Sequence, residues 1–167
     1  LNASVMITHD NMPSVLRVGD LQTFSNLEAG NLYGFNEVYY QYETDKLTIK
    51  IGGQDINSDF FVTENGLLFA HSSMGIDPVA TINMPAPTYP FTGFSVTANW
   101  QVNENLRLKA GIFDGQFAED RDGFLPISWT LKKDEGLIYV FEPEISLFDN
   151  RANTKLTFYH HSGDFVS

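Results

Sequence analysis

The sequence has no cysteine, few basic residues and no long hydrophobic run. The absence of cysteine excludes disulfide bonds and thiol chemistry. Lysine and arginine number 10 against 21 acidic residues, and the net charge of −11 argues against a nucleic-acid-binding protein, a class that is usually basic. No apolar stretch approaches the length of a membrane-spanning helix, so a role in a membrane would require strands.

The residues that are present favour a folded β protein. Hydrophobic residues make up 43% of the 167 positions, which excludes a disordered composition and suits one domain with a sizeable core. Aromatic residues reach 14%, which favours strands and interfaces over helices. The chain begins at Leu1 without a signal peptide or an initiator methionine. We interpret residues 1–167 as a single unit that is either a mature protein or a piece of one.

The clearest local pattern is a ribbon with two different faces. Residues 35–52 alternate apolar and polar side chains on both sides of a tight turn at Thr44-Asp45. Pairing Glu43 with Lys46 would gather the apolar side chains on one face and the polar ones on the other. Such a ribbon separates either a protein core from water, or lipid from a water-filled lumen.

Two further hairpins are expected downstream. Within residues 94–112, a turn at 103–105 would place Trp100 opposite Leu108 and polar side chains opposite one another. Residues 137–161 form a less regular hairpin. The polar side of that hairpin carries Glu142, Glu144 and Lys155.

The connections between the expected strands alternate in length. Residues 9–33, 54–91 and 114–136 are long connections, whereas the hairpin turns are short. In an up-and-down barrel successive connections lie at opposite ends, so all short turns would share one end and all long loops the other. The pattern predicts an all-β, antiparallel, up-and-down transmembrane β-barrel, with the short turns at one end and the long loops at the other. Tyr42 and Trp100 near the short turns are consistent with an aromatic girdle.

Several short motifs follow one another in a fixed order and spacing. They include LYGFNEVYYQ at 32–41, IKIGGQDIN at 49–57 and GIFDG at 111–115, with shorter ones at 18–22, 25–29, 60, 68–69, 72–75 and 87–90. Together they resemble the OprB family of carbohydrate-selective porins, over most of residues 4–115. The resemblance implies a channel in the outer membrane of a Gram-negative bacterium that passes mono- or oligosaccharides by passive diffusion.

Members of this family are considerably longer, with barrels of about 16 strands. The present sequence predicts seven strands and an eighth at the C-terminus. An unpaired strand edge is not tolerated in lipid, so we expect either a fragment of a larger porin barrel or a smaller closed barrel.

Candidate pore-lining residues lie on the polar faces of the expected strands. A mixed lining of charges and amides can exchange hydrogen bonds with successive sugar hydroxyls and still release the solute. These candidates are Glu37, Tyr39, Gln41, Lys50, Asn99, Arg107, Lys109, Glu142 and Glu144. Trp129 is the candidate aromatic platform on which a sugar ring could stack. The loops at 54–91 and 114–136 are expected to fold inward and narrow the lumen.

Two other functions stay open. One is a soluble, secreted, all-β carbohydrate-binding module; the other is a fragment of a β-rich glycoside hydrolase, for which Glu142 and Glu144 would be the carboxylates. The adjacent His160 and His161 point to opposite faces of a strand and cannot easily share a metal. We expect no catalytic residue, metal or cofactor. Expected partners are carbohydrate solutes and outer-membrane lipid, with a homo-oligomer left open and nucleic acid excluded. An outward direction of Tyr40 and Trp100 would favour the membrane interpretation.

Overall fold

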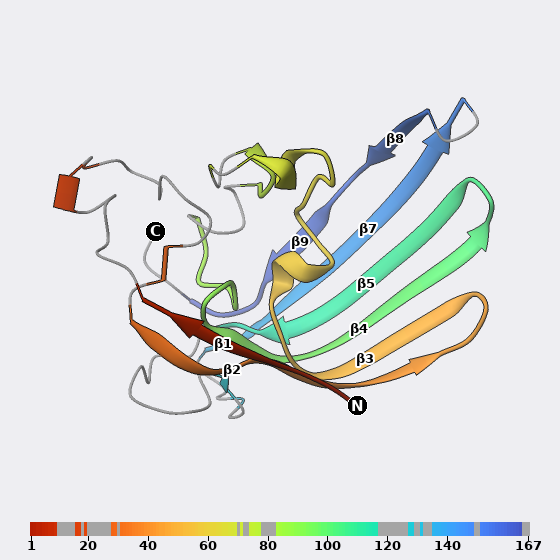
Figure 1. The fold of residues 1–167 in the computed structure, drawn as a ribbon. Coiled ribbons are helices and arrows are strands. Elements are labelled where there is room, and N and C mark those ends of the chain that lie inside the picture. The colour runs from red at the N-terminus through yellow and green to blue at the C-terminus, as the bar shows by residue number, and fades with distance from the viewer. Residues whose placement is uncertain are drawn as a thin grey trace.

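The computed structural model describes residues 1–9, 16–17, 19, 28–29, 31–69, 71, 74–77, 83–116, 127–128, 131, 135–148 and 151–164. These residues form one antiparallel sheet of consecutive neighbours, to which only the short β6 is added in parallel (Figure 1). The strands are β1 (Asn2–Thr8), β2 (Leu32–Glu43), β3 (Leu47–Gln54), β4 (Thr92–Asn103), β5 (Leu106–Asp114), β6 (Ile127–Ser128), β7 (Leu137–Leu147), β8 (Ala152–Lys155) and β9 (Phe158–His161).

The expected all-β, up-and-down architecture is confirmed. In Figure 1 the short turns β2–β3, β4–β5 and β7–β8 lie together at one end of the curved sheet, and the strand ends that lead into long connections lie at the other. The sheet is not closed, because the described part of β1 pairs with β2 alone and β8 and β9 pair with β7 alone. No helix among the described residues is long and apolar enough to cross a membrane.

The register of the first hairpin differs from the prediction by two residues. Glu43 pairs with Thr48 rather than with Lys46. The turn is wider than expected because the Thr44 N–H donates to Leu47 O at 2.8 Å and Thr44 Oγ1 accepts from Leu47 N at 3.0 Å. A shift of two residues leaves every side chain on its predicted face, since the strand repeat is also two.

The second hairpin has the predicted register, with Trp100 opposite Leu108 and Asn99 opposite Lys109. The third is also formed, but its outer strand is divided into β8 and β9. The interruption lies opposite Pro143, which has no N–H to donate to the ladder, although Leu156 N still donates to Pro143 O at 3.2 Å.

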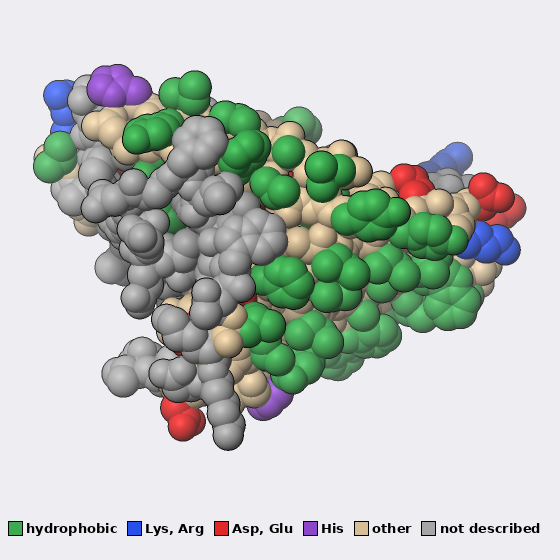
Figure 2. Space-filling view, turned by 90° about the horizontal axis from the view of Figure 1, so that it is seen from below, with side chains coloured by type: hydrophobic (Ala, Val, Ile, Leu, Met, Phe, Trp, Pro, Cys, Tyr) green, Lys and Arg blue, Asp and Glu red, His purple; other side chains and the backbone are tan. Residues whose placement is uncertain are grey.

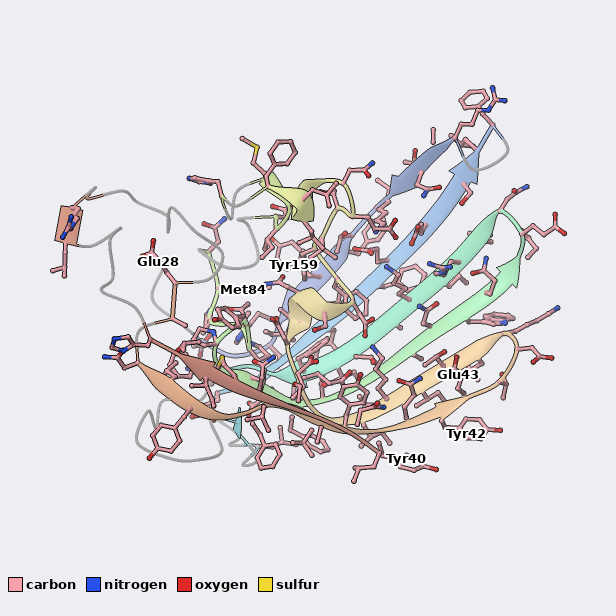
Figure 3. The ribbon with its side chains drawn as sticks, in the orientation of Figure 1. Glu28, Tyr40, Tyr42, Glu43, Met84 and Tyr159 are labelled. Atoms are coloured by element: carbon pink, nitrogen blue, oxygen red, sulfur yellow. The ribbon has the colours of Figure 1, made fainter. Side chains whose placement is uncertain are left out.

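The convex face of the sheet is apolar. Tyr40, Ile51, Val96, Ile112 and Tyr139 form one row across β2, β3, β4, β5 and β7 and are between 39% and 59% exposed. Figure 2 shows apolar side chains gathered on this face from the short-turn end toward the middle of the sheet. The outward direction that would favour the membrane interpretation is found for Tyr40 and Trp100, which are both exposed. In Figure 3 the labelled Tyr40 and Tyr42 point away from the concave side.

The buried core is small and lies on the concave side, at the end of the long connections. Phe113, Ile138 and Val140 contribute to it from β5 and β7. The remaining members come from the connection between β3 and β4: Ile56, Phe60, Phe61, Met84 and Ala86. This core therefore attaches a connecting segment to the inside of the sheet rather than joining two layers of strands.

Candidate functional site

The predicted pore-lining residues of the strands share the concave face. They alternate along each strand with the exposed apolar residues of the convex face, as the strand repeat requires. Neighbouring strands bring them together in register pairs: Gln41 with Lys50, Asn99 with Lys109, Lys109 with Glu142, and Arg107 with Glu144. Glu37 and Tyr39 continue the same face along β2, and contact of any of these residues with a solute stays a prediction.

A cluster of charged side chains crosses this face. We call this cluster the charged belt; its members are Arg107, Lys109, Glu142, Glu144 and Lys155. Lys109 Nζ lies 3.2 Å from Glu142 Oε1 and 3.5 Å from Glu144 Oε2. Arg107 Nη1 and Lys155 Nζ lie 3.8 and 4.0 Å from the same oxygen of Glu144. Lys109, Glu142 and Glu144 are buried. Buried charges are tolerated only when they are paired, so these three groups depend on one another.

Neutral groups complete the belt. Thr157 Oγ1 donates to Glu142 Oε2 at 2.6 Å, and Arg107 Nε donates to Gln101 Oε1 at 2.8 Å. Glu142 is only 1% exposed. Glu142 and Glu144, the carboxylates of the glycoside hydrolase alternative, thus both lie within 4.0 Å of a lysine ammonium group.

The described residues from Asp55 to Asp77, which we call the constriction segment, lie over the concave face (Figure 1). It contains two short 3-10 helices, η2 (Ile56–Ser58) and η3 (Gly66–Leu68), and an isolated bridge between Val62 and Ile76. The Phe60 ring packs edge-on against Phe113 with centroids 5.8 Å apart, and Phe61 packs against Tyr159 at 5.6 Å. The described part of this long loop therefore folds inward as predicted, whereas most of the loop at 114–136 lies outside the described residues.

Two carboxylates anchor the base of the constriction segment. Glu37 Oε1 accepts from Asp55 N at 3.0 Å and from Ser58 Oγ at 2.8 Å. The Asp55 carboxylate accepts from Asn57 N at 2.8 Å and from Tyr89 N at 3.2 Å, and so ties both ends of the connection together. Burial, and to a lesser degree the charge of Glu37, raise the pKa of Asp55 to about 7, although the two backbone N–H donors act in the opposite direction.

Open space remains on both sides of the belt. A concavity of about 550 Å³ near the short turns is lined by polar side chains, among them Gln101, Arg107, Glu144, Ser146 and Asn153. A smaller one of about 270 Å³ lies between the constriction segment and the wall, next to Glu142, Lys155 and Thr157. Volumes of this order suit small solutes.

A comparison with models of protein families matches residues 2–167 to the family described as carbohydrate-selective porin, OprB family. The chain belongs to the OprB family of carbohydrate-selective porins. The match extends well beyond residue 115, where the resemblance of the motifs had weakened. This is a family of channels rather than of enzymes. Comparisons with curated proteins and with solved structures found no significant match.

Some residues of the candidate site were not predicted. Trp129, the candidate sugar platform, lies outside the described residues. Asp55 and Asp59 were not singled out, because nothing in their local sequence separates them from ordinary loop acids. Lys155 was placed on the polar side of the third hairpin but was not named as a pore-lining residue, although it pairs with Glu144. Thr157 could have been found, since it lies two residues further along the same side.

Proposed function

We propose that this chain forms part of the wall of a channel in the outer membrane of a Gram-negative bacterium, through which mono- or oligosaccharides diffuse passively. The opposite polarity of the two sheet faces carries the proposal. The convex face presents aromatic and aliphatic side chains suited to lipid, whereas the concave face presents charges and amides suited to water and sugar.

Selection for sugars would follow from how the charges are balanced. Lys50, Lys109 and Lys155 each have a carboxylate oxygen within 4.0 Å. A lining of paired charges offers many donors and acceptors but only a weak net field, which suits a neutral solute rich in hydroxyl groups. Each contact is weak enough to be exchanged as the solute moves, and the solute gradient is the only driving force.

A soluble carbohydrate-binding module is the alternative from another class. Such a module would need to cover its apolar face, but Tyr40 and Trp100 are 59% and 48% exposed on the convex surface. A contiguous apolar surface of this extent is unfavourable in water. The porin function is therefore the one that the geometry supports best.

The test is liposome swelling. The protein that contains this chain is reconstituted into liposomes, which are diluted into isotonic glucose, maltose or raffinose. We expect swelling that is faster than in protein-free liposomes and that slows as the sugar becomes larger. Absence of sugar-dependent swelling would contradict the proposal. Hydrolysis of a glycan to shorter products by the pure protein would also contradict it.

A further inference from the structure

Three lysines from three strands hold one short stretch of the constriction segment. Lys50 Nζ of β3 lies 2.8 Å from Asp59 Oδ2. Lys109 of β5 donates from Nζ to Asp59 O at 3.1 Å, and Lys155 of β8 donates from Nζ to Val62 O at 3.3 Å. We propose that these lysines, the lysine clamp, are positioning residues that fix the constriction segment over the pore wall and so set the size of solute that passes.

The clamp is largely removed from water. The side chains of Lys50, Lys109 and Lys155 are 18%, 9% and 19% exposed. Ammonium groups buried to this degree require charged partners and hydrogen-bond acceptors. Lys109 and Lys155 have their carboxylates on the wall and their carbonyl acceptors on the segment, so each joins the two parts.

The backbone between the anchor points also requires support. Phe61 lies between Asp59 and Val62 and has a φ of 58°, in the left-handed region that is unfavourable for a residue other than glycine. Its carbonyl accepts from Asp77 N at 2.8 Å, and its ring packs on Tyr159. Aromatic packing buries apolar surface but is not directional, so it does not fix one position of the segment. The lysine contacts join specific atoms and so define where along the wall the segment lies.

A holding role differs from the direct contact with solute that the sequence suggested for Lys50 and Lys109. Both ammonium groups already lie against oxygens of the segment or wall. The Arg107 side chain is 41% exposed, against 9% for Lys109, and it lines the larger concavity. In this arrangement Arg107 meets the solute and the clamp holds the constriction.

This inference rests on the proposed function and is tested with Lys50→Met, Asp59→Asn and the double variant, reconstituted for swelling in glucose and raffinose. Lys46→Met, in the exposed β2–β3 turn, is the control. We expect the raffinose-to-glucose ratio of swelling rates to rise roughly twofold or more in each clamp variant, because a released segment widens the passage. The double variant should match the single ones, since all three remove the same ion pair.

An unchanged ratio in Asp59→Asn overturns the clamp. That variant keeps the shape of the side chain, so it remains informative if Lys50→Met does not insert. A second measurement is the inhibition by glucose of the ion current through the reconstituted protein. If glucose inhibits the current less in Lys50→Met but as usual in Asp59→Asn, the clamp is also overturned, because Lys50 would then bind the solute directly. Failure of the unmodified protein to swell in glucose would instead refute the proposed function.

Discussion

Asp55 lies just beyond the end of β3, outside the strands of the sheet. Its carboxylate accepts hydrogen bonds from both ends of the connection that contains the constriction segment. Glu37 supports the same corner by accepting from Asp55 N. The corner therefore combines a buried carboxylate with a second one close by, and both features favour the protonated form of Asp55.

The raised pKa of Asp55 has a definite consequence for stability. The folded-state pKa of about 7 exceeds the ordinary value of 3.8, so the unfolded chain ionises first as the pH rises. Below the lower value both states are protonated and the group has no effect. Stability should fall between the two values and level off above about 7.

Comparison of denaturation midpoints of the unmodified protein and of Asp55→Asn across this range provides the check. The amide mimics the protonated carboxyl group, so the midpoint difference between the two proteins should change through the window and be constant above it. A difference that is independent of pH would contradict the assignment of a raised pKa to Asp55.

At the scale of the element, the fit between the constriction segment and the sheet depends on a missing side chain. Gly111 of β5 faces the segment, and a Cβ built there would lie 2.6 Å from Phe113 Cε2 and 3.0 Å from Phe60 Cε2. The edge-on pair of Phe60 and Phe113 therefore occupies the space that the glycine leaves open.

We predict that Gly111→Ala displaces the Phe60 ring and destabilises the protein by about 1–3 kcal/mol, the usual cost of overpacking a core. The free energy of unfolding in denaturant measures the effect. Ala110→Gly, on the exposed convex face of the same strand, is the control for the change in backbone freedom. Equal stability of Gly111→Ala and the unmodified protein would show that Phe60 does not pack at this site.

The hairpins illustrate which parts of an element can be predicted from the sequence. The faces were predicted correctly because alternation is a property of neighbouring residues. The register of the first hairpin was wrong because Thr44 forms turn hydrogen bonds that widen the connection. The division of the last strand into β8 and β9 could have been anticipated from Pro143. Proline has no N–H, so it cannot donate a hydrogen bond to the strand beside it.

At the scale of the whole molecule, the sheet order followed from the alternation of short and long connections, whereas the contacts made across the concave face could not be predicted in this way. Lys155 and Val62 are 93 residues apart in sequence, and Lys109 and Asp59 are 50 apart. Contacts of this kind depend on where the constriction segment comes to lie, which no local pattern specifies. The pore-lining candidates could therefore be placed on a face, but their partners could not be named.

The central claim is that the convex face meets lipid and the concave face meets the water-filled interior. Nitroxide labels along β4 test this claim most directly, with the protein in lipid vesicles. Single cysteines are introduced at positions 95 to 100, and each label is specific because the sequence has no cysteine of its own. We predict that labels at Val96, Ala98 and Trp100 collide freely with oxygen and are shielded from a water-soluble nickel complex, with the oxygen signal falling at each residue between them. Labels at those three positions that are accessible to nickel, or shielded from both reagents as in a packed interior, would contradict the account.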